Sequence, residues 1–205
     1  MKGKGVLFGI AAILAAMLFI SCSDESVITV DILIEPSLDY DIIMPFNNGF
    51  AIVQKDGKQG FIDKTGNITV PLIYEKVHDF SEGLALVRKD TPYISYGFVD
   101  EKGIEIIPLI YSWAQDFNEG LASVVKDSKS GFIDKTGNVA VPLIYDFSFD
   151  FSEGLARVRK NGKEGFVDKE GNEIVPLIYD IVRPFDGGVA IVRKGDKWGI
   201  LEISR

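Results

Sequence analysis

The chain has 205 residues, of which 46% are hydrophobic and 25% are charged, a balance typical of a globular protein rather than a disordered one. Thirty acidic side chains against 22 basic ones give a formal net charge of −8, which leaves no basic field for a nucleic-acid partner. A single histidine and a single cysteine exclude a disulfide framework and a metal site built from several Cys or His ligands. We therefore expect no cofactor and no metal site.

The N-terminal segment has the features of a secretory signal peptide. Two lysines precede an uncharged apolar run over residues 6–20, which is shorter than the ~20 residues that a membrane-spanning helix needs. The run ends at Cys22 in a sequence that resembles a bacterial lipobox, with Phe19 where leucine is usual. We expect residues 1–21 to be removed and Cys22 to be lipidated. The alternative is an uncleaved anchor in which Cys22 is buried and inert.

Residues 22–40 are then expected to form a lipid-tethered linker and a partial repeat strand. Ser23-Asp24-Glu25 lacks the aspartate after the cysteine that resembles an inner-membrane retention signal, and it is similar to an acidic surface-export tag of some lipoproteins. Because the protein is acidic, the lipid rather than the protein surface should contact anionic headgroups. We predict a lipid-anchored protein of the bacterial cell envelope at the outer membrane, with the periplasmic and surface-exposed orientations both open.

Residues 41–205 form a tandem repeat. Three independent sequence markers recur at intervals of 34 or 37 residues, which indicates four full units and one partial unit. The markers are Pro-Leu-Ile-Tyr at 71–74, 108–111, 142–145 and 176–179; Phe-x-x-Gly at Phe46, Phe80, Phe117, Phe151 and Phe185; and Gly-Phe-(Ile/Val)-Asp at Gly60, Gly97, Gly131 and Gly165.

Each unit has the pattern of three short antiparallel strands. In the fourth unit, a strand over 154–160 leads to Asn161-Gly162, a dipeptide that favours a two-residue hairpin turn. A second strand begins at Gly165, and a third should stop before Pro176 because proline cannot donate to a β ladder. No segment after residue 22 has a sustained helical period, so we predict an all-β protein with little helix.

The ends of the repeat leave two arrangements open. Residues 28–41 resemble a degraded third strand, and the last unit stops after its second strand. Together these pieces would complete a fifth unit, as in a five-bladed propeller-like closure, which removes exposed sheet edges. We favour a curved, open, solenoid-like array, because a unit of 34 residues is short for a propeller blade.

The repeated residues resemble the bacterial WG-repeat proteins, also called KWG-repeat proteins. Lys197-Trp198-Gly199 contains the tripeptide that names the family, and the resemblance covers about 41–205. It implies an all-β repeat architecture and interaction roles, and it carries no catalytic residue over to this chain. The tryptophan is interpreted as an optional packing element. In the other units its place is held by Gln59, Tyr96, Ser130 and Glu164.

The repeated carboxylates are interpreted as turn residues rather than as catalytic groups. Each occupies the same place in every unit, whereas a catalytic pair needs one asymmetric pocket. No calcium-loop motif occurs in any unit. We therefore predict that the protein is not an enzyme. The carboxylates are Glu82, Glu119 and Glu153, with Asp63, Asp100, Asp134 and Asp168.

Aromatic residues at fixed places in the units are expected to pack between neighbouring units, because packing recurs with the repeat. They include Phe80, Phe117, Phe151, Tyr111, Tyr145 and Tyr179.

The segments in which the units differ are the candidate binding surface. A five-residue stretch follows each Pro-Leu-Ile-Tyr, and stacked units would place these stretches side by side. The stretches contribute Trp113 and Phe149, two aromatic residues suited to an exposed ridge, together with Arg183. His78 belongs to the first stretch, although a histidine without a neighbouring nucleophile or co-ligand is by default a surface residue.

A longer hairpin loop in the second unit, at residues 91–96, adds the candidates Tyr93 and Tyr96. Sequence drift in a tolerant loop explains the same insertion equally well.

Taken together, these features predict a non-enzymatic protein-interaction module whose partner is an envelope or extracellular protein. The alternative is a carbohydrate- or peptidoglycan-binding module. That alternative requires a row of aromatic side chains on one exposed face.

Overall fold

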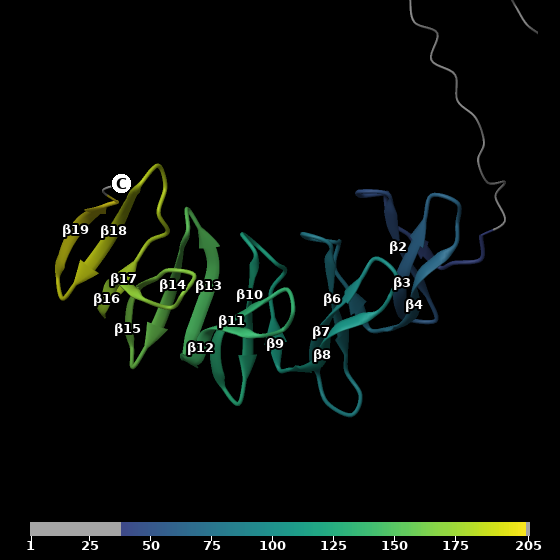
Figure 1. The fold of residues 1–205 in the computed structure, drawn as a ribbon, viewed down its shortest axis with the longest axis horizontal. Coiled ribbons are helices and arrows are strands. Elements are labelled where there is room, and N and C mark those ends of the chain that lie inside the picture. Colours follow the sequence, from purple (N-terminus) through teal and green to yellow (C-terminus); the bar gives the residue numbers. More distant parts are fainter. Residues whose placement is uncertain (1–37, 204–205) are drawn as a thin grey trace, which may run out of the picture. The chain divides into compact units, whose positions relative to one another are not determined.

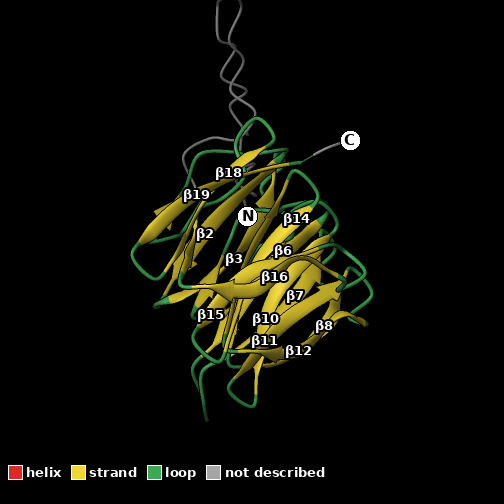
Figure 2. Cartoon of the chain, turned by 90° about the vertical axis from the view of Figure 1, so that its left-hand side faces the viewer, coloured by secondary structure: helices red, strands yellow, loops and turns green. Residues whose placement is uncertain are grey.

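The computed structural model describes residues 38–203, which form nineteen β-strands and no helix (Figure 2). The all-β prediction is confirmed for this part of the chain. The predicted signal peptide, Cys22 and most of the predicted linker 22–40 lie outside the described residues. Within residues 38–203 there is no helix long and apolar enough to span a membrane.

The strands form five antiparallel sheets, one for each repeat, that follow one another along the chain (Figure 1). The first four sheets have four strands each in chain order, and the fifth has three. The prediction of three strands per unit was too low, because the variable stretch after Pro-Leu-Ile-Tyr forms a short strand that pairs with the next hairpin. The sheets are β1 (Ile42–Ile43), β2 (Phe50–Lys55), β3 (Lys58–Asp63) and β4 (Ile68–Tyr74); β5 (Lys76–Val77), β6 (Leu84–Lys89), β7 (Ser95–Asp100) and β8 (Glu105–Tyr111); β9 (Trp113–Ala114), β10 (Leu121–Lys126), β11 (Lys129–Asp134) and β12 (Val139–Tyr145); β13 (Phe147–Ser152), β14 (Leu155–Lys160), β15 (Lys163–Val167) and β16 (Glu173–Tyr179); and β17 (Ile181–Val182), β18 (Val189–Lys194) and β19 (Lys197–Glu202).

The predicted hairpin turn of the fourth unit is present. Asn161 and Gly162 join β14 to β15 with φ angles of 53° and 74°, so both residues have the left-handed conformation that this two-residue turn requires. The strands on either side pair in register from Lys160 and Lys163 onward.

In the four sheets that have a third long strand, this strand does not stop at its proline. In the fourth sheet, Phe166 pairs with Val175 and Glu164 pairs with Tyr179, so β16 has two more residues than β15 between these pairs and forms a bulge. Pro176 lies in this bulge, in a strand at the edge of the sheet, where its missing N–H breaks no ladder hydrogen bond. The prediction that the strand ends before Pro176 was therefore wrong.

The bulge also explains the glycine of Gly-Phe-(Ile/Val)-Asp. A Cβ atom on Gly165 would lie 2.3 Å from the carbonyl oxygen of Val175, closer than any side chain allows. The fifth sheet lacks the bulged strand, and there the nearest atom to a Cβ on Gly199 is Cγ2 of Val192 at 3.5 Å. The glycine is thus required by its neighbouring strand and not by its own backbone angles.

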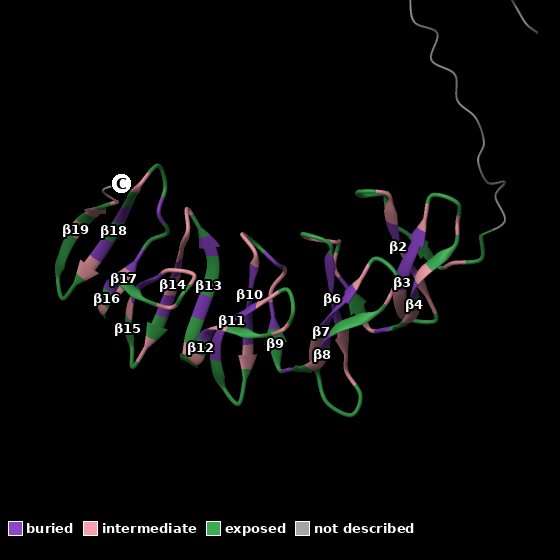
Figure 3. Ribbon diagram, viewed as in Figure 1, coloured by how far each residue is buried: buried purple, intermediate pink, exposed green. Residues whose placement is uncertain are grey.

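The core lies between successive sheets. The phenylalanine of Gly-Phe in one sheet packs against the phenylalanine of Phe-x-x-Gly in the next sheet, and the ring centroids are 4.6 to 4.8 Å apart. Tyr111 and Tyr145 are buried as well, and Figure 3 shows the buried residues in the middle of the long strands, away from the turns. The predicted packing of repeated aromatic residues between units is confirmed. The pairs are Phe61–Phe80, Phe98–Phe117, Phe132–Phe151 and Phe166–Phe185.

Candidate functional site

The variable stretches form the two-residue strands β5, β9 and β17 and the first part of the longer strand β13, each at one edge of its sheet. We call residues 75–79, 112–116, 146–150 and 180–184 the variable ridge. Its neighbouring members lie side by side, as predicted: Nδ1 of His78 is 3.1 Å from the carboxylate oxygen Oδ2 of Asp116. The third residue of each stretch is buried, and these residues are Val77, Ala114, Ser148 and Val182.

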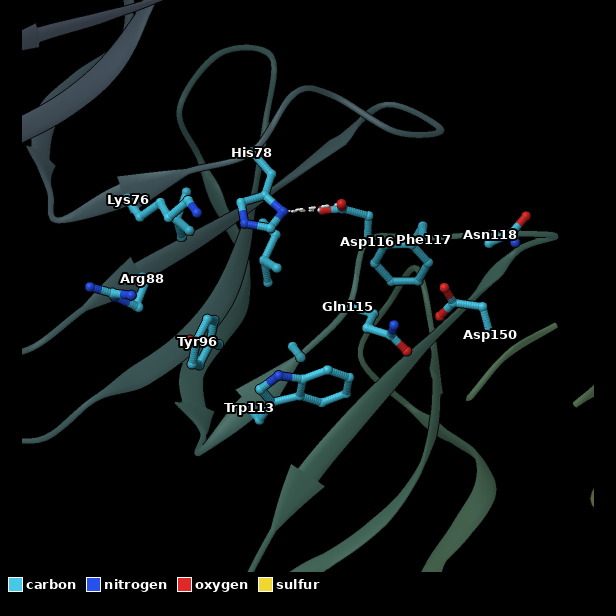
Figure 4. A pocket seen from close by; sticks show the side chains of 13 residues that line it. Lys76, His78, Arg88, Tyr96, Trp113, Gln115, Asp116, Phe117, Asn118 and Asp150 are labelled. Atoms are coloured by element: carbon cyan, nitrogen blue, oxygen red, sulfur yellow. Dashed lines mark hydrogen bonds and ion pairs between the residues drawn. The ribbon is translucent and has the colours of Figure 1, made fainter. Parts of the chain in front are cut away.

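A first cavity of about 380 Å³ lies on the ridge between the second and third sheets. Trp113 and Tyr96 contribute aromatic walls, and the carboxylate of Asp116 faces His78 (Figure 4). The other polar side chains include Lys76, Arg88, Gln115, Asn118 and Asp150.

One carboxyl group in this cavity has a perturbed pKa. Desolvation raises the pKa of Asp150 above its ordinary value, and the negative charge of Asp116 raises it further. The residue as a whole keeps an exposed surface, so water still reaches it and limits the size of this effect.

A second cavity, of about 490 Å³, lies on the ridge between the third and fourth sheets. Three aromatic side chains line it, namely Trp113 from β9 and Phe147 and Phe149 from β13. The guanidinium carbon of Arg157 lies 3.6 Å from the centroid of the Phe149 ring, which is close enough for a cation–π contact. Trp113 and Gln115 line both cavities, so the two are neighbours.

The remaining predicted binding residues lie elsewhere. Arg183 lines an open groove on the fifth sheet with Trp198 and Ile200. Tyr93 is 82% exposed in the loop between β6 and β7 and lines none of these three hollows. Tyr96 belongs to β7 and not to the loop, so the two tyrosines of the insertion are separated.

The structure therefore brings together four of the six predicted binding residues, His78, Tyr96, Trp113 and Phe149, along the two ridge cavities. Sequence reasoning did not single out the other six residues of the second cavity, although three of them had a signal in the sequence. Phe147 is an aromatic residue of the same variable stretch as Phe149, and Gln115 belongs to the stretch of Trp113. Ser130 is the smallest residue found at the place of the repeat tryptophan, which was the available signal.

The repeated carboxylates are engaged in turns and in contacts between sheets. Asp134 accepts hydrogen bonds from the amides of Thr136 and Asn138 within its own turn, at 2.9 and 3.0 Å. Glu119 accepts one from the amide of Gly154 in the next sheet at 3.1 Å. None of the repeated carboxylates lines a ridge cavity, and residues 38–203 contain no cluster of three His, Cys, Asp or Glu side chains suited to a metal ion.

Comparison with solved structures finds a protein of unknown function from Bacteroides caccae. The two sequences are 16% identical over 77% of this chain and 71% of that chain, and the TM-score is 0.33. No curated protein is significantly similar to this sequence.

The comparison with protein families finds the WG containing repeat. Its pattern matches five successive segments, which together cover most of the sequence: 31–58, 60–90, 96–129, 131–163 and 165–198. The chain therefore belongs to the WG-repeat family.

Proposed function

We propose that the protein is a non-enzymatic interaction module that binds a protein partner through the variable ridge. The observation that carries this proposal is the group of exposed aromatic side chains around the second cavity. Trp113, Phe147 and Phe149 are 39%, 57% and 40% exposed. Clustered exposed aromatic residues mark interaction sites, and buried aromatic anchors dominate the energy of protein interfaces.

The test is partner capture from intact cells. The tagged protein is crosslinked in cells, purified, and compared with the Trp113→Ala and Phe149→Ala variants. We expect both variants to lose a discrete envelope protein. Ile178→Ala, which removes a 40% exposed aliphatic side chain from β16, should keep it. Unchanged capture by both ridge variants contradicts the proposal, and Tyr93→Ala tests the hairpin loop separately.

Carbohydrate or peptidoglycan binding is the second candidate, and the same aromatic group favours it. Trp113, Phe147 and Phe149 line one cavity and are partly exposed, and exposed aromatic side chains support this candidate because sugar rings pack against them. Titration with soluble peptidoglycan fragments while recording tryptophan fluorescence tests it. Saturable quenching that Trp113→Ala abolishes, without any captured protein, supports this candidate over the first.

We further propose that lipidated Cys22 holds this module at the bacterial outer membrane. The support is sequence alone: the apolar run over 6–20, the cysteine at its end and the polar residues that follow. Acyl chains contribute about 0.8 kcal/mol for each buried methylene group, so a multiply acylated cysteine anchors a protein without a helix. Metabolic labelling with a fatty acid should be lost in Cys22→Ala, and protease treatment of intact cells should distinguish the surface from the periplasm.

The open array remains our proposal for the arrangement of the repeats. In the inner sheets the phenylalanine of Phe-x-x-Gly is covered by the preceding sheet, whereas Phe46 in the first sheet is 50% exposed. At the other end, Ile200 in β19 is 76% exposed. Ring closure would be expected to cover such end residues. Hydroxyl-radical footprinting tests this, because strong labelling of Phe46 is expected for the open array and protection for the closed one.

A further inference from the structure

In two units, the residue at the place of the repeat tryptophan accepts a hydrogen bond from the next sheet. Oε1 of Gln59 in β3 accepts the amide proton of Val77 at 3.0 Å, and Oε2 of Glu164 in β15 accepts that of Val182 at 2.9 Å. Val77 pairs with Val87, and the amide of the next residue, His78, donates to the carbonyl of Leu86. Val77 is therefore at a non-hydrogen-bonded position, and its N–H points away from β6, toward the free edge of the sheet. A side-chain oxygen of one sheet thus satisfies the edge amide of the next.

The third unit lacks a side chain that makes this hydrogen bond. Ser130 holds the place, and Ser148, which pairs with Val158, is the residue that corresponds to Val77 and Val182. In the described part of the chain, no side-chain acceptor reaches the amide of Ser148. The second cavity opens between them instead and is lined by both serines.

Two buried side-chain atoms of residues that line this cavity have no protein partner. Ser130 is 2% exposed, and its Oγ makes no hydrogen bond. Gln115 lines both cavities, and its buried Oε1 is also without a partner. Buried polar atoms that lack a partner carry a free-energy cost that a ligand can remove.

Two other polar groups of the cavity are already engaged. The hydroxyl of Ser148 bonds that of Ser123 at 2.6 Å, and the carboxylate of Asp146 accepts from Nζ of Lys129 at 2.7 Å. An occupant that accepts from the amide of Ser148 and donates to Oε1 of Gln115 would satisfy both groups. A carboxamide does both, whereas a carboxylate has no proton to donate.

From this arrangement we propose that the second cavity binds a glutamine side chain of a partner polypeptide. This side chain completes the junction between the third and fourth sheets, as Gln59 completes the junction between the first and second. Its carboxamide meets the amide of Ser148, the hydroxyl of Ser130 and Oε1 of Gln115. Its methylene stem, with the neighbouring peptide residues, packs against the walls formed by Trp113, Phe147 and Phe149. This inference rests on the proposed function and names the group that is recognised.

The experiment uses a library of random twelve-residue peptides displayed on phage and selected on the mature protein. We expect the selected peptides to share a glutamine beside apolar residues and to shift the ¹⁵N–¹H resonance of Ser148 in a titration. Ser130→Gln should weaken their binding by at least about tenfold, because the new side chain occupies the cavity. Ser152→Gln makes the same change at an exposed position of β13 and should leave binding unchanged.

Changing the peptide keeps the test valid if Ser130→Gln fails to fold. Replacing the shared glutamine by leucine or by glutamate should each weaken binding by at least about tenfold. The inference is overturned if no peptides are selected, if they share no glutamine, or if they bind Ser130→Gln as tightly. A Ser148 shift with N-acetylglucosamine and none with the peptides would make the cavity a glycan site. Partner capture that needs Trp113 but tolerates Ser130→Gln would overturn this inference and leave the proposed function standing.

Discussion

The carboxylate of Glu82 accepts a hydrogen bond at 3.1 Å from the amide of Gly120, which lies 38 residues further along the chain in the next unit. The same carboxylate pairs with Nζ of Lys135 at 2.9 Å. Glu119 and Gly154 repeat the contact at the next junction. A glutamate that recurs in the sequence is thus a connector between sheets, which gives its recurrence a structural reason.

Glu82→Ala should weaken the junction between the second and third sheets. The variant loses a charge-assisted hydrogen bond and an ion pair that is only partly exposed, so the free energy of unfolding should fall by about 1–2 kcal/mol. Glu101→Ala is the matched control, because Glu101 is exposed in a turn. Urea denaturation followed by circular dichroism measures both. Equal losses in the two variants would show that the connector adds no stability.

The contribution of Glu82 should also depend on pH. The hydrogen bond from Lys135 holds the pKa of Glu82 below its ordinary value of 4.5; desolvation opposes this shift, and the amide of Gly120 supports it. A carboxylate with a lowered pKa in the folded state stabilises the fold fully above the unfolded pKa, and this stabilisation is lost as the pH falls through the folded pKa. The stability difference between the natural protein and Glu82→Gln should be constant near neutral pH and shrink below about pH 4.5. A difference that stays constant down to pH 3 would contradict this linkage.

Much of the architecture follows from the period of the sequence. The hairpin turn at Asn161-Gly162 and the repeated phenylalanine contacts were predictable, because turn chemistry and core packing leave local or periodic signals. The strand through Pro176 was not, since a bulge depends on which neighbour the strand has and on its position at the sheet edge.

Gly165→Ala tests the bulge. An added Cβ would meet the carbonyl oxygen of Val175 at 2.3 Å, and a backbone atom in a ladder has little room to move. The free energy of unfolding should fall by about 3 kcal/mol. In Gly199→Ala, where the nearest atom is a methyl group at 3.5 Å, the loss should stay below about 1 kcal/mol. If Gly165→Ala does not fold, its soluble yield and circular dichroism spectrum report the loss. Equal stability of Gly165→Ala and Gly199→Ala would show that a side chain at position 165 does not clash with Val175.

The candidate site could be predicted only in part. Exposed aromatic residues in variable segments, such as Trp113 and Phe149, stand out against the repeat. Ser130 shows its role only when the contacts made by Gln59 and Glu164 at the same place are known. A cavity that arises from a missing side chain leaves no motif of its own.

The position of a phenylalanine in the array should decide what it contributes. Phe151 is 2% exposed and packs against Phe132 at 4.7 Å, whereas Phe46 at the same place of the first unit is 50% exposed. Phe151→Ala should lower the free energy of unfolding by about 3–5 kcal/mol, because it removes a buried ring and leaves a cavity. Phe46→Ala should cost less than about 1 kcal/mol. Thermal unfolding of the two variants in the same buffer compares these losses. A large loss of stability in Phe46→Ala would indicate that another part of the protein covers Phe46.

Asp150→Asn should stabilise the protein at neutral pH. The pKa of Asp150 is raised by desolvation and then by the charge of Asp116, so folding opposes the ionised form of this carboxyl group. For a carboxyl group with a raised pKa, the favourable contribution is present below the unfolded pKa and is lost as the pH rises through the folded pKa. The gain from Asp150→Asn should therefore be largest near neutral pH and fade as the solution is acidified past the ordinary pKa of aspartate. Urea denaturation across this pH range measures the gain in stability, with Asp196→Asn in the exposed hairpin between β18 and β19 as the control.

Because His78 lines the same cavity and contacts Asp116, the Asp150→Asn series should be repeated in a His78→Gln background. A gain that survives there assigns the effect to the two carboxylates, and a variant that is less stable at neutral pH would refute the assigned pKa shift.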